Sequence, residues 1–404
     1  MPGMSEQTPD RHGESDRATE RGIERGTERG AVVEFDKVTK RYGGRQTGAA
    51  VDNLSMRIPG GEICVFVGPS GCGKTTSLKM VNRLVEPTSG AIRIDGEGVL
   101  QRDPVKLRRS IGYVIQQTGL FPHLTIGANV ATVPRLVGWD RDRAKRRADE
   151  LIELVGLDPA KYRDRYPSQL SGGERQRIGV ARAIACDPPV LLMDEPFGAV
   201  DPITRERLQN EFLRLQKQLS TTILMVTHDI DEAIKMGDRI AVFQPGGVLA
   251  QFGTPVEILE NPANEFVARF VGGDRSLKRL SLGRVRDLEL EHPPTIRTGD
   301  DAATILSVIT SSDRPYVLMV DQRDAPVGWL WERDLRSPGP VGPERASSPE
   351  PLLDPDSTLR DALSAMLESA VQEGVVVDGS GTFLGTVSVE AIAASLRQPA
   401  RAGA

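Results

Sequence analysis

Cysteine is scarce in this sequence. Only Cys64, Cys72 and Cys186 occur among 404 residues, an odd number without the spacing of metal-ligating thiols. Such a set offers no disulfide framework and suits a reducing cytosol. We therefore expect a fold that depends on its hydrophobic core rather than on covalent cross-links.

Long apolar runs are also missing. The longest span only a few residues, as in Val190–Met193, whereas a membrane-spanning helix needs about 20 apolar residues. The start of the chain lacks the basic-then-apolar pattern of a secretory signal. If the protein acts at a membrane, we expect another chain to supply the spanning helices.

An excess of basic residues is absent as well. The formal net charge is −5, whereas proteins that coat nucleic acid usually carry a basic footprint. We therefore expect no nucleic-acid partner. The length of 404 residues is too great for one ordinary domain, and a hydrophobic content of 39% is typical of a globular protein.

The first 30 residues differ in composition from the rest. They are polar and charged, and the triplet Glu-Arg-Gly recurs three times within residues 20–30. Like charges four residues apart and repeated glycines both oppose a helix. We therefore expect residues 1–30 to form a disordered arm.

Residues 31–272 have the pattern of an α/β domain. The runs Val190–Met193 and Thr222–Val226 are short, apolar on both faces and bounded by polar residues, which is typical of strands in a buried parallel sheet. Apolar residues recur at helical spacing in 141–155. We expect a parallel-sheet core, a β-rich edge before it and a helical insertion around 125–182.

The remainder of the chain contains an internal repeat. Each half has a helix start, an apolar strand, a turn and a strand that begins near a glycine. Repeats of this kind pack on each other because neither buries its apolar face alone. The segments that we predict are a linker at 273–283, a first repeat at 284–337, a linker at 338–350, a second repeat at 351–397 and a tail at 398–404.

A phosphate-binding motif follows the apolar run Ile63–Val67. The stretch from Gly68 to Thr75 fits G-x-x-x-x-G-K-[ST] and opens a helical stretch, which is the context that the motif requires. Its glycines let backbone N–H groups surround phosphates, and the helix N-terminus adds its positive end. We expect Lys74 to reach the β- and γ-phosphates and the Thr75 hydroxyl to bind Mg²⁺.

Two adjacent acids end the run Val190–Met193. Strand ends place side chains at the carboxyl edge of a parallel sheet, where ligands bind in open α/β folds. We expect Asp194 to hold the metal ion and Glu195 to orient and deprotonate an attacking water. Adjacent acids can also be solvated charges, so this interpretation depends on the phosphate-binding motif.

The run Leu-Ser-Gly-Gly-Glu-Arg-Gln-Arg at 170–177 lies between these two motifs. Ser171, Gly172 and Gly173 at a helix start offer a hydroxyl and free N–H groups, a second phosphate-binding surface. Here the sequence resembles the ATPases of ABC transporters, for which this signature is diagnostic. The resemblance covers residues 31 to about 272 and implies a P-loop NTPase cassette with an antiparallel β subdomain and a helical subdomain.

The resemblance implies further roles. Tyr42 resembles the aromatic residue that stacks on adenine, and Gln116 resembles the glutamine that contacts Mg²⁺ and senses the membrane subunits. Asp201 occupies the D-loop position, and His228 resembles the switch histidine that touches the γ-phosphate. In this family two copies pair head to tail, and each signature completes the other copy's nucleotide site.

These arguments define the expected site residues. The residues expected to be catalytic are Glu195, His228 and Lys74, and those expected to bind the metal ion are Thr75, Gln116 and Asp194. The residues expected to bind ATP are Tyr42, Gly68, Pro69, Ser70, Gly71, Cys72, Gly73, Lys74, Thr75, Thr76, Gln116, Ser171, Gly172, Gly173 and Asp201. Two departures from the family pattern, Glu174 and Gly198, leave this set intact, so we expect an active ATPase.

Other stretches resemble a narrower group. Residues 111–123, 227–235 and 254–268 resemble the ATPases of quaternary-amine importers, which take up glycine betaine, choline, carnitine or proline betaine. The paired tail units resemble a tandem CBS α/β module. The resemblance implies ATP and Mg²⁺ as cofactors, a second copy and membrane permease subunits as partners, an indirect link to an extracytoplasmic substrate-binding protein, and a peripheral place on the cytoplasmic face of the membrane.

CBS pairs often bind a small nucleotide through Gly-x-x-[Ser/Thr]-x-x-Asp. The first repeat has Trp331 at the hydroxyl position, and the second has Ala391 in place of the acid. Each copy therefore lacks one ribose-binding group. Ionic-strength sensing and dimerisation are the alternative roles for the tail.

Three alternatives to the main interpretation remain. The chain could serve another importer class, such as one for amino acids. It could be a soluble ABC ATPase acting on ribosomes or DNA, although the single cassette without long coiled coils disfavours this. It could be a nucleotide-sensing regulator, although the complete catalytic set in 42–228 disfavours that. Because the ATPase does not touch the transported solute, the sequence does not choose among the quaternary amines.

Overall fold

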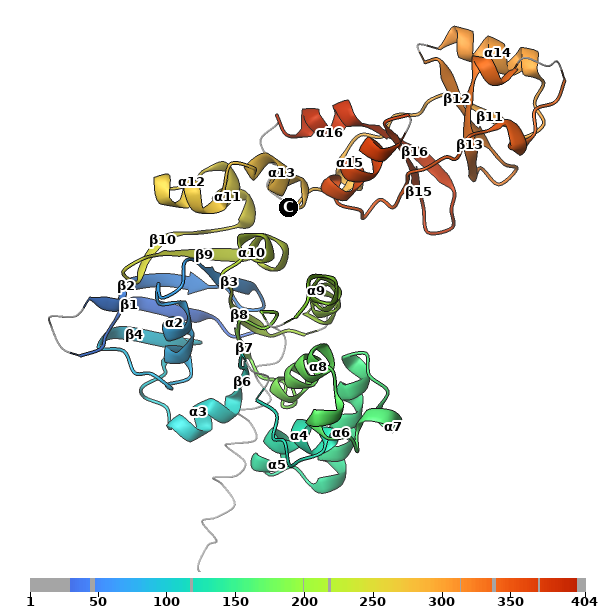
Figure 1. Cartoon of the computed structure of the whole chain (residues 1–404). Coiled ribbons are helices and arrows are strands. Elements are labelled where there is room, and N and C mark those ends of the chain that lie inside the picture. The colour runs from blue at the N-terminus through green and yellow to red at the C-terminus, as the bar shows by residue number, and fades with distance from the viewer. Residues whose placement is uncertain are drawn as a thin grey trace, which may run out of the picture. The chain divides into compact units, whose positions relative to one another are not determined.

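The computed structural model divides into two compact units, residues 1–270 (unit 1) and 271–404 (unit 2) (Figure 1). It describes residues 30–43, 48–116, 119–198, 200–216, 219–312, 314–335, 339–369 and 371–397. The predicted arm, apart from Gly30, and the predicted tail at 398–404 lie outside these residues. Within the described ranges, no helix is both long and apolar enough to cross a membrane.

Unit 1 is built on a six-stranded sheet in the order β10-β9-β3-β8-β7-β6, in which only β10 runs antiparallel to its neighbour. Every residue of β3, β7 and β8 is buried, which explains why these strands are apolar apart from Asp194 at the end of β7 and Thr222 at the start of β8. The predicted parallel-sheet core is confirmed. The strands are β3 (Ile63–Val67), β6 (Ile111–Val114), β7 (Val190–Asp194), β8 (Thr222–Val226), β9 (Arg239–Gln244) and β10 (Val248–Gly253).

A four-stranded antiparallel sheet in the order β2-β1-β4-β5 forms the predicted β subdomain. It shares a hydrophobic core with the larger sheet, because the ring of Phe35 on β1 meets the ring of Phe66 on β3 edge-on at a centroid distance of 6.2 Å. The strands are β1 (Val33–Arg41), β2 (Ala49–Ile58), β4 (Ser89–Ile94) and β5 (Glu97–Gly98).

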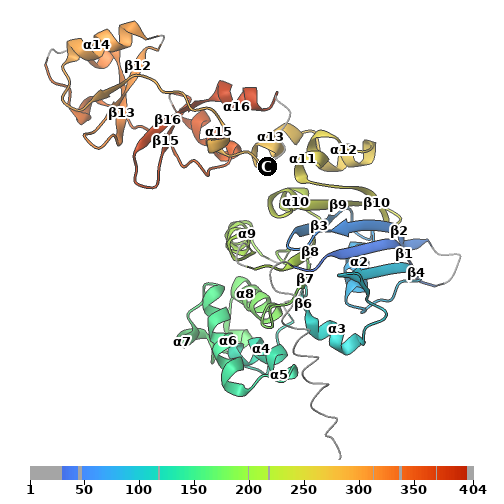
Figure 2. The same ribbon diagram turned by 180° about the vertical axis from the view of Figure 1, so that it is seen from behind.

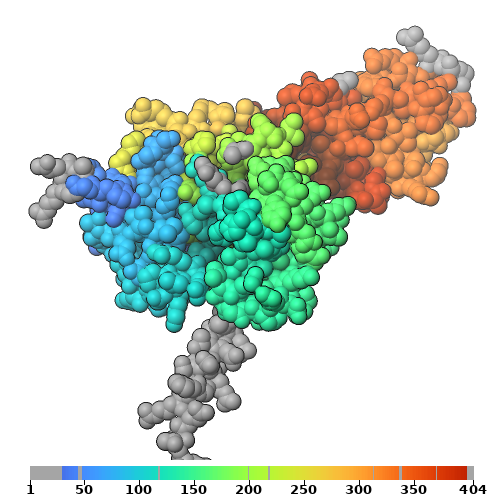
Figure 3. Space-filling model, turned by 60° about the horizontal axis from the view of Figure 1, so that its bottom comes forward, coloured from blue at the N-terminus to red at the C-terminus, as the bar shows by residue number. Residues whose placement is uncertain are grey.

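The helices of unit 1 flank the large sheet and form a separate helical region (Figures 1 and 2). Helix α2 packs against β7 and β8, and α10 packs against β3. Figure 3 shows the helical region in green beside the antiparallel region in blue. The helices are α2 (Lys74–Val81), α3 (Pro104–Ser110), α4 (Ile126–Val130), α5 (Thr132–Leu136), α6 (Arg141–Leu154), α7 (Pro159–Tyr162), α8 (Gly172–Ala183), α9 (Pro202–Gln216), α10 (Ile230–Met236), α11 (Pro255–Glu260) and α12 (Glu265–Val271), the last of which reaches the boundary of the unit.

Unit 2 contains two sheets of the same topology, as expected for an internal repeat. In each, the first strand pairs in parallel with the second across an intervening helix, and the second pairs antiparallel with the third. The first repeat consists of β11 (Thr295–Arg297), α14 (Ala302–Ser311), β12 (Tyr316–Val320) and β13 (Pro326–Trp331). The second consists of β14 (Leu352–Leu353), α15 (Leu359–Glu368), β15 (Glu373–Val377), β16 (Phe383–Ser388) and α16 (Val389–Ser395).

The segment 273–283, predicted to be a linker, is part of the folded unit. It contains helix α13 (Arg275–Leu280), whose Leu280 is buried with Leu359 in the core of the second repeat. The basic residue Arg279 of this segment has internal partners, because its guanidinium donates to the carbonyl oxygens of Ser395 and Leu396 at the end of α16. A cation at a helix C-terminus is electrostatically favourable, so Arg279 caps α16 and helps to hold this segment on the second repeat.

The segment 338–350 departs from the linker prediction in the same way. Val341 is fully buried in the core of the first repeat, and the carbonyl oxygen of Gly339 accepts a hydrogen bond from the Ala302 N–H at the start of α14. Val285, assigned by sequence to the first repeat, packs in the core of the second. The segment before the first repeat therefore packs in the core of the second, and the segment before the second repeat packs in the core of the first. This exchange joins residues far apart in the sequence, so local composition does not reveal it.

This exchange predicts that Leu280→Ala destabilises unit 2. Because Leu280 is 1% exposed, we expect truncation to lower the free energy of unfolding by about 2–4 kcal/mol. Leu277→Ala is the matched control, since Leu277 lies on the same helix but is 53% exposed. Urea unfolding of the full chain, followed by tryptophan fluorescence, measures the difference. Equal effects of the two variants would contradict the packing of α13 on the second repeat.

Candidate nucleotide site

The phosphate-binding motif forms the turn between β3 and α2. Gly68, Gly71 and Gly73 all have positive φ angles of 152°, 77° and 95°, a region that favours glycine. A Cβ at Gly68 would lie 2.2 Å from the Phe243 carbonyl oxygen, and one at Gly73 would lie 2.2 Å from that of Ala50. The loop is therefore held close to the surrounding backbone. Pro69, Ser70, Cys72 and Thr76, the other expected loop residues, lie in the same turn or at the start of α2.

Lys74 is buried at the first position of α2. Its Nζ donates to the carbonyl oxygens of Gly68 at 2.7 Å and Pro69 at 2.9 Å and lies 3.7 Å from the Cys72 Sγ. The ammonium group is thus folded against the loop that the sequence assigns to phosphate binding. Phosphate oxygens are stronger acceptors than carbonyl oxygens because they carry charge. The geometry suits a lysine whose donors transfer to a nucleotide phosphate.

Thr75 and Asp194 meet across the sheet edge. The Thr75 hydroxyl donates to the Asp194 Oδ1 at 2.9 Å, although the two residues are 119 positions apart. Asp194 is buried at the carboxyl end of β7, and this burial raises the pKa of its carboxyl, while the Thr75 hydrogen bond opposes the shift. A hydroxyl and a carboxylate at this distance form an oxygen-rich pair of the kind that Mg²⁺ prefers.

Glu195 lies between Gln116 and His228. The Gln116 Nε2 donates to the Glu195 Oε2 at 3.0 Å, and the His228 Nδ1 lies 3.6 Å from the Glu195 Oε1. Glu195 adopts a positive φ of 46°, a strained conformation that is found preferentially at functional sites. The structure therefore brings Gln116, Glu195 and His228 together, although the sequence places them in three separate motifs.

Ser171 caps helix α8 in a reciprocal arrangement with Glu174. The Ser171 N–H donates to the Glu174 Oε2 at 2.6 Å, and the Glu174 N–H donates to the Ser171 Oγ at 3.3 Å. The Tyr162 hydroxyl donates to the Glu174 Oε1 at 2.6 Å. The hydrogen bond from Tyr162, followed by those from Ser171, lowers the pKa of the Glu174 carboxyl. The departure from glutamine at this position thus forms a capping box held in place by a tyrosine.

This arrangement predicts a difference between two substitutions of Glu174. In Glu174→Ala the hydrogen bonds to the Glu174 side chain are lost, so we expect α8 to lose about 1 kcal/mol of capping stability. We also expect ATP turnover to fall roughly tenfold, because Ser171 and its neighbours in the signature would shift from their positions. In Glu174→Gln the amide oxygen still accepts from Ser171 and its NH₂ group can donate to Tyr162, so turnover should stay near that of the native protein. Phosphate-release assays on the two variants test this, and equal losses in both would contradict the capping role.

Tyr162 could not be identified from the sequence. Two residues that the sequence did predict, Asp201 and Tyr42, have contacts of their own. Tyr162 gives no sequence signal, because it lies on α7, nine residues before Ser171. Asp201 caps the start of α9 through the Thr204 N–H at 3.1 Å. Tyr42 is half-exposed at the end of β1, with the Lys40 ammonium 5.0 Å from the centre of its ring. Within the described residues, Ser171 and Asp201 take no part in the hydrogen bonds around Lys74 and Glu195.

Asn129 is a further residue that the sequence does not reveal. Its side chain is fully buried and bonds the backbone of Phe121 in both directions, at 2.7 and 3.1 Å, and the carbonyl oxygens of Leu124 and Thr125. These bonds hold the backbone of residues 121–125 against α4. A single asparagine in a short helix carries no pattern that would identify this role.

In the second repeat, Gly385 and Ser388 occupy the glycine and hydroxyl positions of the Gly-x-x-[Ser/Thr]-x-x-Asp pattern, and both have partners within the tail. The Ser388 hydroxyl accepts from the Ala391 N–H at 3.2 Å and donates to the Glu291 Oε1 at 3.1 Å. A Cβ at Gly385 would lie 2.9 Å from the Glu291 carbonyl oxygen. The Ser388 hydroxyl is therefore already engaged, by a Glu291 carboxylate that also pairs with Arg314.

Comparison with known proteins gives two family matches. Residues 51–198 match the ABC transporter family, and residues 345–397 match the CBS domain family. Among curated relatives, an osmoprotectant import ATP-binding protein from Salmonella typhimurium is 46% identical over 90% of this chain and 95% of its own. A glycine betaine/carnitine/choline transport ATP-binding protein from Bacillus subtilis is 44% identical over 88% and 94%.

A solved structure matches unit 1. The dimeric structure of an ATP-binding cassette in a post-hydrolysis state, bound to ADP and Pi, is 33% identical to this chain with a TM-score of 0.50. It covers 55% of this chain and 98% of its own. Taken with the identities of the curated relatives, these matches establish that this chain belongs to the ATP-binding proteins of ABC transporters, in the family of the osmoprotectant, carnitine and choline transport ATPases, and that it carries a C-terminal CBS domain.

Proposed function

We propose that this chain hydrolyses ATP to power import of a quaternary-amine osmoprotectant, as a peripheral subunit on the cytoplasmic face of a membrane permease. The proposal of ATP hydrolysis is supported chiefly by the position of Glu195, which lies between Gln116 and His228 and directly follows Asp194 of the Thr75–Asp194 pair. The transport half rests on relatives that span nearly the whole chain and are named for osmoprotectants, glycine betaine, carnitine and choline.

We assign the following roles from the geometry of these residues and, for Tyr42 and His228, also from the resemblance to the family. Lys74 exchanges its carbonyl partners for the β- and γ-phosphate oxygens. Glu195 accepts the proton of the attacking water, and the Gln116 amide holds its carboxylate in place. His228, whose Nδ1 lies 3.6 Å from the Glu195 Oε1, orients that water and the terminal phosphate. Tyr42 lies at the end of β1, where we propose that it stacks on adenine.

The residues at the sheet edge fit Mg²⁺. The Thr75 hydroxyl and the Asp194 carboxylate would hold the ion, and the side-chain carbonyl of Gln116 is the third candidate ligand. When bound, the ion neutralises charge on the phosphates. Its hard-oxygen preference agrees with this donor set.

The signature residues act on a second copy of the chain. Ser171 and Gly173 lie at the N-terminus of α8, where free N–H groups and the helix dipole attract phosphate, but the Lys74 cluster of the same copy does not include them. We propose that they complete the partner's nucleotide site, with Asp201 at the junction. We assign the CBS tail to regulation or dimerisation rather than to nucleotide binding, because Glu291 engages Ser388.

Uptake by cells tests the transport proposal. Cells with and without this gene are given labelled glycine betaine, choline or carnitine, each at low and high external osmolarity. We expect the deletion to lose uptake of at least one of them, and the native gene to restore it. Undiminished uptake of all three, in a strain whose other importers have been removed, would assign the ATPase to another importer class.

A further inference from the structure

The position of His228 depends on the loop that carries it. Its side chain is 63% exposed, and its Nδ1 lies 3.6 Å from the Glu195 Oε1. Because so much of the side chain faces solvent, packing alone does not fix its orientation. Two side-chain turns hold the loop instead. The Thr227 Oγ accepts from the Asp229 N–H at 3.1 Å, and the Asp229 Oδ1 accepts from the Glu232 N–H at 3.3 Å. The placement of His228 therefore follows that of its two neighbours.

A buried carboxyl group lies beside this loop. Glu232 is 9% exposed in the first turn of α10, and the Gln209 Nε2 of α9 donates to its Oε1 at 2.9 Å. Burial raises the pKa of Glu232, while hydrogen bonding from Thr227 and from Gln209 opposes that shift. Thr227 is itself 2% exposed, and its N–H donates to the Phe66 carbonyl oxygen at 3.0 Å. Glu232 therefore acts on the residue directly before His228.

Two charged groups also act on the Glu232 carboxyl group. The Arg205 guanidinium of α9 lowers its pKa, and the Asp229 carboxylate raises it. The Arg205 Nη2 donates to the Val200 carbonyl oxygen at 3.0 Å, and the Arg205 N–H donates to that of Asp201 at 2.8 Å. A buried polar group costs free energy unless it is hydrogen-bonded, and a satisfied network fixes the arrangement of its members. This network joins the segment at Asp201 to the loop before α10.

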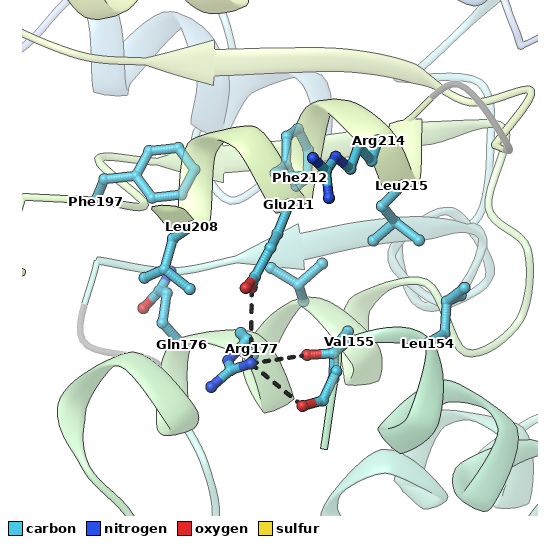
Figure 4. Close-up of a pocket in the computed structure, with 12 residues that line it drawn as sticks. Leu154, Val155, Gln176, Arg177, Phe197, Leu208, Glu211, Phe212, Arg214 and Leu215 are labelled. Atoms are coloured by element: carbon cyan, nitrogen blue, oxygen red, sulfur yellow. Dashed lines mark hydrogen bonds and ion pairs between the residues drawn. The ribbon is translucent and has the colours of Figure 1, made fainter. Parts of the chain in front are cut away.

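Helix α9 supplies Gln209 from a packed position. Figure 4 shows Leu208 and Glu211 of α9 directed towards α8, and the Glu211 Oε2 lies 3.6 Å from the Arg177 Nη1. Successive residues of a helix are about 100° apart around its axis, so Gln209 lies on a different side from Leu208 and reaches Glu232. The donor to Glu232 therefore comes from a helix whose other side is held by α8.

We propose that Glu232 is a positioning residue for His228. It holds Thr227, and through the hydrogen bond between Thr227 and Asp229 it holds the backbone of His228 where the imidazole reaches Glu195. Gln209 orients the carboxyl group of Glu232 for this task. Glu232 thus acts through the loop rather than at the reacting atoms. The inference rests on the proposed function, because it concerns the part that His228 plays in ATP hydrolysis.

Steady-state kinetics gives the first test. Glu232→Met removes the hydrogen-bonding groups at similar length, and we expect kcat to fall about 10- to 100-fold, because a small displacement of a catalytic group has an effect of this size. The KM for ATP should stay within about threefold, since residues 68–75 are unchanged. Glu232→Gln keeps an acceptor for Gln209 and gains a donor for the Thr227 hydroxyl, so it should keep at least about a third of the native kcat. The matched control is Glu206→Met, at a glutamate whose side chain is 73% exposed.

The NMR signal of His228 gives a second readout that does not depend on turnover. The full chain is labelled with ¹³C-histidine and saturated with ADP, and the Cε1–H signal of His228 is identified by its loss in His228→Ala. We expect Glu232→Met to shift or broaden this signal, and Glu232→Gln to restore it. The signals of the other three of the four histidines should not change, which shows that the fold is intact.

A milder variant keeps the test decisive if Glu232→Met fails to fold. Gln209→Leu removes only the donor from α9, and it should lower kcat several-fold and move the His228 signal in the same direction as Glu232→Met. Native kcat in these variants, or a lower kcat with an unmoved His228 signal, would overturn the inference. Failure of the proposed function differs, because His228→Ala would then keep the native kcat while the NMR comparison still tests the effect of Glu232 on the loop.

Discussion

Glu195→Gln should abolish ATP turnover while leaving ATP binding intact. The amide is nearly isosteric with the carboxylate and can still contact Gln116, but it cannot accept a proton from water. We expect kcat to fall by a factor of about 10² to 10⁴, the usual contribution of a positioned general base. The Kd for ATP should change by less than a few-fold, because Lys74 and the loop that we assign to phosphate binding are untouched.

The same variant should accumulate as an ATP-bound dimer, because nucleotide that is not hydrolysed continues to bridge two copies. Phosphate release measures turnover, and size-exclusion chromatography with ATP and Mg²⁺ measures the dimer. The matched control is Glu206→Gln, an exposed glutamate on α9 whose ion pair with Lys235 spans 3.8 Å. Turnover of Glu195→Gln within threefold of the native rate would remove Glu195 from the role of base.

Glu373→Ala should strongly destabilise unit 2. The buried Glu373 carboxylate accepts from the Arg314 guanidinium at 2.9 Å and from the Tyr316 hydroxyl at 2.7 Å, and so joins the second repeat to the first. Among the described residues, its removal leaves the more exposed Glu291 as the one ion-pair partner of Arg314. Breaking a buried ion pair from one side costs about 3–5 kcal/mol, which is the loss that we expect in the free energy of unfolding.

A double variant distinguishes the net contribution of the Arg314–Glu373 ion pair to the free energy of unfolding from the cost of leaving one of its charges unpaired. Arg314→Met with Glu373→Leu replaces both charges with apolar groups of similar length, and such replacements are often neutral. We therefore expect the double variant to be more stable than Glu373→Ala. Urea unfolding followed by the fluorescence of Trp329, which is buried against Tyr316, reports on this junction. The exposed Glu390→Ala should change stability by less than about 0.5 kcal/mol, and an equal effect of Glu373→Ala would contradict a buried pair.

The nucleotide site could be predicted from the sequence to the extent that its residues belong to local motifs. Lys74 and Thr75 follow a strand and open a helix, and Asp194 and Glu195 end another strand, so parallel pairing alone brings them to one edge. Gln116 and His228 carry no such signal by themselves, and only resemblance identified them. Their contacts with Glu195 depend on the order of β6, β7 and β8 in the sheet, which single-sequence patterns do not define.

The organisation of the tail was only partly predictable for a related reason. The repeat is visible because both halves alternate helix and strand patterns, and the two sheets confirm it. The predicted linkers differ from the structure because one apolar residue in each, Leu280 and Val341, decides its packing. A single leucine or valine among polar residues has no periodicity, so its burial against a segment about 40 to 80 residues away in sequence cannot be seen from composition.

Transport by a reconstituted complex tests the central claim most directly. The chain and its permease subunits are placed in lipid vesicles with the substrate-binding protein outside, and MgATP is supplied at the face that binds this chain. The account predicts accumulation of labelled glycine betaine, choline or carnitine with the native chain and none with Glu195→Gln. Equal accumulation with both, or ATP hydrolysis that no quaternary amine stimulates and that moves none of them, would contradict it.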